Sequence, residues 1–449
     1  MFSSALSEMY KTEVPLYGDL LDLVADINAV EIHSGSDKQD WASEGTRSRL
    51  SVERHGAIRL GTARELATMR RLFAVMGMEP VGYYDLSAAG VPVHATAFRA
   101  TGDDALARNP FRVFTSLLRL ELIEDVALRG RAAAVLERRS IFSRGCLELV
   151  EKFESDGGLV DAEAKEFVAQ ALETFRWHGE APVTLEAYRE LRAAHPLIAD
   201  VVCFKGPHIN HLTPRVLDID KAQEEMVRRG IPAKASIEGP PKRKVPILLR
   251  QTSFLALEEA IRFSGAEGHL VGTHTARFGE IEQRGCALTP KGRQLYDELL
   301  SSARAQGSSS EILSREFIAF PDDLRELHRS RLIHVRYAVG NNLDANGSAL
   351  PPESSDVDLD ALIDAGQLLI QPMVYEDFLP VSAAGIFQSN LGNENRTGYT
   401  SGSNLSEFEV ALGVPVVDEF ELYRAREAES LTIALQALGA AHAAASGAA

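Results

Sequence analysis

Two stretches of this chain share one order of predicted elements, and that repeat limits the possible folds more than any other feature. In each stretch a short strand that carries a histidine comes first, followed by a helix and then by further strands. No clear sequence identity accompanies the shared order. Two such βαβββ units usually pair into one curved sheet around a central site. We therefore expect an α+β fold of paired βαβββ modules that form a curved mixed sheet.

The first unit combines a strand, a capped helix and two more strands. Residues 54–61 have the pattern of a short strand, and Thr62 occupies a favourable position for a helix N-cap. Apolar side chains recur at helical spacing over 63–76, which predicts a helix. Strands are expected over 78–86 and 91–99.

The second unit begins near Pro207, with a predicted strand over 209–216 that carries His211. Asp218 or Asp220 is placed to cap a helix that runs to Arg229. Three further strands complete the unit, and they are expected over 232–237, 246–254 and 273–284.

Helical patterns dominate the remainder of the chain. They predict helices over 16–30, over 113–122 and, as a long C-terminal helix, over 418–438. The predicted organisation is an N-terminal helical segment 1–50, a first βαβββ-like module 51–102, a helical insertion 103–205, a second βαβββ module 206–288, and a C-terminal region 289–449 that contains the last helices and completes the pocket.

The overall composition argues against several classes of protein. Over 449 residues the formal net charge is −17, which is unlike a nucleic-acid-binding surface. Three widely spaced cysteines fit a reducing compartment without a disulfide framework. No apolar run reaches the length of a membrane span, and no signal peptide is recognised. We expect a cytoplasmic protein without nucleic-acid or membrane partners, and its oligomeric state stays open.

Residues 273–285 place several charges on one face of a predicted strand. Side chains two residues apart in a strand share a face, so Glu280, Glu282 and Arg284 lie together. Two carboxylates on one face repel each other unless something offsets them. Arg284 can offset one, and a bound cation would offset the other. The alternative is a solvated edge strand with a Glu–Arg pair.

Histidines in the first strands of both units are candidate metal ligands. His55 and Arg59 are four residues apart and share a face, which suggests a metal with an anionic substrate beside it. His211 lies in the apolar part of its strand, whereas His208 is expected in a loop. His55, His211 and Glu280 would form a two-histidine, one-carboxylate set that leaves positions on iron(II) for substrate and dioxygen. The alternative is a surface His and Arg.

Several sequence strings resemble known metalloenzymes. I-N-H-L-T-P-R-V and F-G-E-I-E-Q-R are similar to the metal-bearing strands of the vicinal oxygen chelate superfamily, above all to those of 4-hydroxyphenylpyruvate dioxygenase and hydroxymandelate synthase. The iron-binding Glu of those enzymes stands three residues before the Gln, which indicates Glu280 rather than Glu282. Nearly the whole chain resembles a narrower family, the 2-oxoadipate dioxygenase/decarboxylases of bacterial lysine breakdown, through R-H-G-A-I-R-L-G-T, H-T-A-R-F-G-E-I-E-Q-R-G-x-A-L-T-P-K-G and Y-E-D-F-L-P-V-S-A-A-G-I-F.

The narrower resemblance implies a reaction and a set of site residues. The cofactor would be iron(II), with 2-oxoadipate and dioxygen as substrates and 2-hydroxyglutarate and carbon dioxide as products. The implied metal ligands are His55, His211 and Glu280. Arg59 would hold the distal carboxylate of the substrate, and the residues that would line the substrate pocket are Val381 and Ser382.

Two further side chains are candidate neighbours of these ligands. Glu282 shares the face of Glu280 and is expected either to hydrogen-bond a ligand or to pair with Arg284. His274 stands at even spacing from Glu280 and is expected either to face the site or to hydrogen-bond the backbone at a strand end. A single Arg beside a ligand, with no pair of Phe flanking the ligands, favours a dicarboxylate over an aromatic substrate.

Two other functions stay open from the sequence. One is a zinc- or nickel-dependent isomerase or lyase of the glyoxalase type on the same scaffold, and the other is a metal-free binding protein. Oxygen consumption separates the dioxygenase from the isomerase or lyase. Metal content separates the binding protein from both enzymes.

Overall fold

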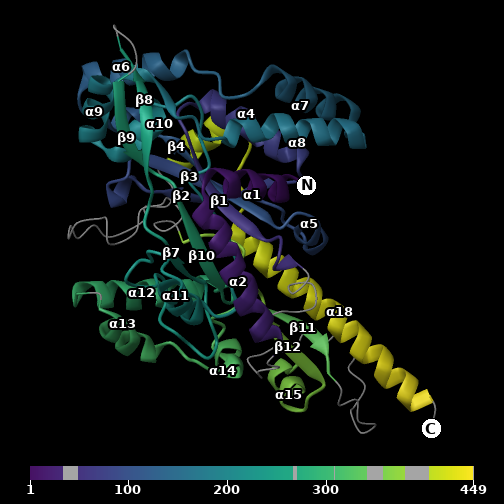
Figure 1. The fold of residues 1–449 in the computed structure, drawn as a ribbon. Helices are drawn as coiled ribbons and strands as arrows, with labels where there is room; N and C mark the ends of the chain where they lie inside the picture. The colour runs from purple at the N-terminus through teal and green to yellow at the C-terminus, as the bar shows by residue number, and fades with distance from the viewer. Residues whose placement is uncertain (34–48, 266–269, 308, 341–356, 380–403, 448–449) are drawn as a thin grey trace.

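One mixed sheet joins the two predicted units. The structure, a computed structural model, describes residues 1–33, 49–265, 270–307, 309–340, 357–379 and 404–447 (Figure 1). Within these residues the largest sheet has seven strands in the order β2-β3-β4-β1-β6-β10-β7. The sheet contains both parallel and antiparallel strand pairs, and helices separate several of its strands along the chain. The expected α+β class, with paired modules in a curved mixed sheet, is confirmed.

The first module has the expected βαβββ order. Its elements are β1 (Arg54–Leu60), α4 (Ala63–Val75), β2 (Glu79–Asp85), β3 (Val93–Arg99) and β4 (Phe111–Leu118). β1 is parallel to β4, and β4, β3 and β2 continue as antiparallel neighbours. The Thr62 hydroxyl accepts a hydrogen bond from the Glu65 backbone N at 3.1 Å, which confirms the predicted cap of α4.

The helix expected over 113–122 is wrong, because Phe111–Leu118 form strand β4. Every residue of β4 is buried, and the strand lies between β3 and β1. A strand buried on both faces lacks the polar–apolar alternation that marks a half-exposed strand, so its pattern is ambiguous. The last strand of the first module therefore lies beyond residue 102, where we expected the helical insertion to begin.

The second module joins the first through its His211 strand. It contributes strands β6 (His211–Pro214), β7 (Leu249–Ser253) and β10 (Phe278–Arg284) to the large sheet, and helix α11 (Ile219–Arg228) follows β6. β6 pairs antiparallel with β1, with Thr213 opposite His55, and β10 lies parallel to β6. The Asp218 side chain caps α11. The strand expected over 232–237 is wrong, since Ala233 makes only an isolated bridge there within the described residues.

The strand expected over 273–284 is two strands in different sheets. β9 (Leu270–Thr275) ends before Ala276 and belongs to a three-stranded sheet with β5 (Glu180–Thr184) and β8 (Glu258–Ser264). β10 then begins at Phe278 in the large sheet. Because the alternation of the sequence runs on across the break, it does not reveal that His274 and Glu280 lie on separate sheets.

Four of the described helices cover one face of the large sheet. Side chains of α1 (Phe2–Glu13), α2 (Pro15–His33), α4 and α11 form one apolar cluster with Ile58, Leu212 and Ile281. The helix expected over 16–30 is thus confirmed as part of α2. α5 (Asp103–Arg108) connects β3 to β4, and between the modules lie α6 (Val126–Glu137), α7 (Arg144–Asp156), α8 (Asp161–Phe175), α9 (Leu185–Ala194) and α10 (Pro196–Val202).

The C-terminal region returns to the end of β10. It contains α12 (Pro290–Ala305), α13 (Ser310–Glu316), α14 (Leu324–Arg329), β11 (Val335–Val339), α15 (Leu359–Asp364), β12 (Leu368–Pro372), α17 (Leu405–Leu412) and α18 (Glu419–Gly447), the long yellow helix of Figure 1. The Tyr375 backbone N donates to Gly285 O at 2.9 Å. Residues 373–377 therefore lie beside β10. Among the described helices, none has the length and apolar character needed to cross a bilayer.

Candidate functional site

Three strands of the large sheet present His55, His211 and Glu280 on the face opposite α1, α2, α4 and α11. β1, β6 and β10 are consecutive neighbours, and the strand alternation that turns Ile58, Leu212 and Ile281 toward the helices turns these three residues the other way. All three are fully buried, and their ligand atoms lie within 4.8 Å of one another. The structure thus brings together the predicted ligand set, which we call the triad.

The triad has buried polar atoms without hydrogen bonds. Glu280 Oε2 lies 3.6 Å from His211 Nε2 and 3.7 Å from His55 Nε2. Neither ring nitrogen of His211 nor Glu280 Oε1 has a hydrogen-bond partner among the described residues. Buried polar atoms are almost always paired, so such a group needs an explanation. Two imidazoles and a carboxylate are the donor set of non-haem iron(II) sites with open positions, and the triad fits such a metal.

Burial keeps the His211 ligand neutral. It lowers the pKa of His211 well below the usual histidine value, and the nearby positive groups act in the same direction. Burial raises the pKa of Glu280, with His55 acting against that change. Burial also lowers the pKa of His55, but Glu282 and Glu280 outweigh it and the net shift is upward. A divalent cation could bind the neutral His211 imidazole, and its positive charge would offset the negative charge of the buried Glu280 carboxylate.

Glu282 lies on the same face and contacts the other nitrogen of His55. Glu282 Oε2 is 3.0 Å from His55 Nδ1, while Arg284 Nε donates to Glu282 Oε1 at 2.7 Å. Burial opposes ionisation of Glu282, but Arg284, His55 and Arg112 hold its pKa below the usual range. The predicted Glu282–Arg284 pair is confirmed. The predicted sharing of one strand face by Glu280 and Glu282 is confirmed as well, since both carboxylates reach His55.

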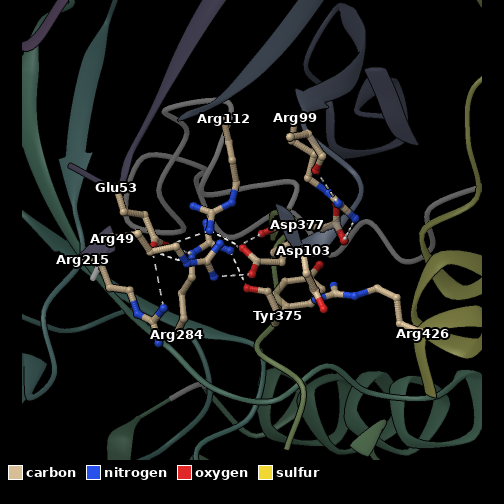
Figure 2. Close-up of polar contacts among 12 residues, drawn as sticks. Arg49, Glu53, Arg99, Asp103, Arg112, Arg215, Arg284, Tyr375, Asp377 and Arg426 are labelled. Carbon is tan, nitrogen blue, oxygen red and sulfur yellow. Dashed lines mark hydrogen bonds and ion pairs between the residues drawn. The ribbon is translucent and has the colours of Figure 1, made fainter. Parts of the chain in front are cut away.

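Arg284 and Arg112 connect Glu282 to a buried network of arginines and glutamates (Figure 2), which the sequence analysis missed. Arg112 Nη2 donates to Glu53 at 2.7 Å and also bonds Glu376, and Arg49 Nη2 donates to Glu376 at 2.5 Å. Arg284 lies 3.7 Å from Glu53. These residues come from distant segments of the chain, so no local spacing marks the network. We call it the arginine network.

Arg59 lies on the same strand as His55 but in a different environment. Arg59 Nη1 donates to Asp200 Oδ2 at 2.6 Å, and its side chain is 11% exposed. Asp200 Oδ1 in turn lies 2.9 Å from His274 Nε2 and 3.3 Å from His208 Nε2. We call Asp200, His208 and His274 the Asp200 cluster. His274 therefore reaches Arg59 through Asp200 and does not share a strand with Glu280; its possible role at the site remains a prediction.

Two aromatic rings flank the histidine ligands, contrary to the sequence argument that no Phe pair does so. Phe278 stacks on His211 with ring centroids 4.8 Å apart, and Phe378 meets His55 edge to face at 5.0 Å. Phe378 comes from the distant C-terminal region, so its place was not visible in the sequence. The absence of a Phe pair can therefore no longer favour a dicarboxylate over an aromatic substrate. Arg59 alone supports that choice. The predicted pocket residues Val381 and Ser382 lie outside the described residues.

Comparisons with known proteins agree along nearly the whole chain. Residues 2–390 match the family model described as 2-oxoadipate dioxygenase/decarboxylase. A relative of that name from Escherichia coli is 55% identical over 436 residues and covers 96% of both chains. One from Mycobacterium bovis is 39% identical over 435 residues, with 94% of this chain and 95% of its own covered.

A solved structure supports the same relationship. The crystal structure of hydroxyglutarate synthase from Pseudomonas putida in complex with 2-oxoadipate has a TM-score of 0.86 and 53% sequence identity to this chain. The match covers 97% of each chain. The family resemblance stated from the sequence strings is confirmed.

Proposed function

Because this chain belongs to the 2-oxoadipate dioxygenase/decarboxylase family, we propose that it converts 2-oxoadipate and dioxygen into 2-hydroxyglutarate and carbon dioxide. The reaction balances without another reductant, since one carbon and two oxygen atoms leave as carbon dioxide while dioxygen supplies two. The observation that carries the proposal is the buried triad in a chain whose relatives bear this name. The proposed reaction makes the protein an oxidoreductase that acts on a 2-oxo dicarboxylic acid.

The proposed cofactor is iron(II), with His55, His211 and Glu280 as its protein ligands. Its support is the donor set and the unpaired buried atoms of the triad. Iron(II) would chelate the 2-oxo acid and activate dioxygen. The proposed role of Glu282 is to contact the Nδ1 side of the His55 ring, which would leave His55 Nε2 to bind the metal.

Arg59 is the proposed partner of the distal carboxylate. It lies on β1 four residues after His55, and its side chain bonds Asp200. An arginine binds a carboxylate through two parallel hydrogen bonds, which fixes both position and orientation. Val381 and Ser382 are proposed to line the same pocket. Phe278 and Phe378 pack on the ligand rings and exclude water from the reacting groups.

The proposed location is the cytoplasm. Cys146, Cys203 and Cys286 are all buried thiols without disulfide bonds, as a reducing compartment favours. Dioxygen and a small 2-oxo acid are the proposed partners.

Oxygen uptake is the direct test. Protein reconstituted with iron(II) is given 2-oxoadipate, and oxygen consumption, carbon dioxide release and 2-hydroxyglutarate are measured together. We expect equal amounts of all three, and a His211→Ala variant that shows none of them. Asp364→Asn, an exposed ion-pair change in the C-terminal region, is the control and is expected to behave like the parent. Stoichiometric iron without oxygen uptake would overturn the proposal in favour of a redox-neutral isomerase or lyase.

A further inference from the structure

Asp200 lies between Arg59 and two histidines, away from the metal triad. It belongs to α10, and its side chain is buried. One carboxylate oxygen accepts from Arg59 Nη1 at 2.6 Å, and the other lies 2.9 Å from His274 Nε2 and 3.3 Å from His208 Nε2. The two histidines thus contact one oxygen of the Asp200 carboxylate, and Arg59 donates to the other.

The Asp200 cluster has the residue types of a metal site, but the charges around it disfavour a bound cation. Its ligand atoms also lie within 4.8 Å of one another and all three residues are buried. However, the Arg59 guanidinium already bonds Asp200, and a second cation there would be repelled by it. His274 Nδ1 lies 2.9 Å from the Tyr188 hydroxyl, and His208 Nε2 lies 3.3 Å from Asn210 Nδ2. These contacts favour a hydrogen-bonded support over an ion site.

Aromatic rings and hydrogen bonds hold the two histidines beside Asp200, whose carboxylate is ionised at neutral pH. Burial opposes ionisation of Asp200, but Arg59 and the two histidines hold its pKa well below the usual range. Trp177 packs edge to face on His208, with ring centroids 4.6 Å apart, and Phe204 packs on His274 at 4.6 Å. Ring contacts as well as hydrogen bonds therefore fix the two imidazoles. The imidazoles in turn fix the orientation of the Asp200 carboxylate toward Arg59.

We propose that Asp200 is a positioning residue, which orients the Arg59 guanidinium so that it receives the distal carboxylate of the substrate, with His208 and His274 as its support. The inference rests on the role proposed above for Arg59. A free arginine side chain samples many rotamers, and holding it in the binding orientation before the substrate arrives reduces the entropy lost on binding. The fork of a guanidinium can serve two carboxylates at once.

A second effect of Asp200 acts in the opposite direction. Its negative charge repels the substrate carboxylate, so a carboxylate that did nothing but neutralise Arg59 would weaken binding. The two effects predict opposite outcomes when Asp200 is changed. Positioning predicts weaker binding of the dicarboxylate after the change, and simple neutralisation predicts tighter binding.

The test compares two ligands that differ only in the distal carboxylate. The iron(II)-loaded protein is titrated calorimetrically under argon with 2-oxoadipate and with 2-oxohexanoate, which has the same six-carbon chain and no second carboxylate. The ratio of the two Kd values measures what the distal carboxylate contributes. It does not depend on turnover, and both titrations use one preparation.

We expect Asp200→Ala to reduce this preference for 2-oxoadipate roughly tenfold, with the Kd of 2-oxohexanoate little changed. Asp200→Asn keeps an oxygen acceptor for Arg59 and is expected to fall between Asp200→Ala and the parent. Asp220→Asn, which removes the charge of another Asp–Arg pair with contacts of 2.8 and 3.0 Å to Arg250, is the matched control and is expected to keep the parental ratio.

The Arg59→Met variant tests the role proposed for Arg59 separately from the role proposed for Asp200. If it keeps the parental preference for 2-oxoadipate, the role of Arg59 is wrong and the inference about Asp200 falls with it. If Arg59→Met removes the preference while Asp200→Ala leaves it unchanged or increases it, only the positioning role is overturned. In the Arg59→Met background, Asp200→Ala is expected to have no further effect on the ratio.

Discussion

The triad and the Asp200 cluster are built from the same kinds of residue and do different things. Each combines two histidines with one carboxylate, and in each the ligand atoms lie within 4.8 Å in a buried setting. In the triad, both nitrogens of His211 and one oxygen of Glu280 have no hydrogen bond among the described residues. In the Asp200 cluster, an arginine already neutralises the carboxylate and a tyrosine contacts a histidine. Composition and distance therefore do not identify a metal site; the hydrogen-bond and charge partners do.

The largest expected difference between the two groups is in metal binding. His211→Ala should weaken iron(II) binding by about two to three orders of magnitude, because the four ligands of structural zinc sites together contribute on the order of 10–16 kcal/mol. His208→Ala in the Asp200 cluster should keep stoichiometric metal. Elemental analysis after desalting measures both. Loss of metal from His208→Ala, or its retention by His211→Ala, would reverse our assignment of the two groups.

Asp200→Asn should lower stability at neutral pH by about 3 kcal/mol, since it removes a buried carboxylate charge that pairs with Arg59. The folded-state pKa of Asp200 is depressed, so its stabilisation is present above the ordinary Asp pKa of about 3.9 and is lost as the pH falls below it. Urea unfolding of parent and variant from pH 7 to 3 should show the gap closing in acid. A gap that stays constant would mean that the charge of Asp200 does not matter.

Glu282→Gln tests the carboxylate beside the triad. It removes the charged partner of His55 Nδ1, and changes of this kind reduce metal affinity or activity by about 10–100-fold. Competition with a metal chelator gives the affinity directly. Glu259→Gln, which alters a charged pair with Arg277 away from the triad, provides the comparison and should bind iron(II) normally. An unchanged affinity in Glu282→Gln would leave Glu282 as a partner of the neighbouring arginines only.

The smallest effect is expected for Tyr188→Phe. Its hydroxyl lies 2.9 Å from His274 Nδ1, and its contacts with Thr273 O and Arg192 Nη1 are longer, at 3.3 and 3.4 Å. The loss of one hydrogen bond costs about 1 kcal/mol, and we expect the shortest of the three contacts to dominate. Thermal unfolding should show the loss, while iron content should stay that of the parent. A lower iron content would connect the Asp200 cluster to metal binding and weaken the distinction drawn between the two groups.

Short-range patterns predicted the parts of the site that depend on strand alternation and caps. The spacing of two residues placed Glu280 and Glu282 on one face, and Thr62 marked the start of α4. The same alternation failed at β4, where both faces are buried, and at Ala276, where the chain leaves one sheet for another. Alternation reports which side chains share a face, but it carries no information about the neighbouring strand.

What the sequence determined by itself is the chemistry of the site: two histidines at the starts of two similar units, a carboxylate on a late strand, and an arginine four residues after the first histidine. The tertiary structure decided the partners. Pairing of β1 with β6 brings His55 to His211, and the folding of α10 against Arg59 supplies Asp200. The arginine network likewise joins residues as distant as Arg49 and Glu376. Charges buried this deeply need partners, and those partners are set by contacts between distant segments, which no local pattern encodes.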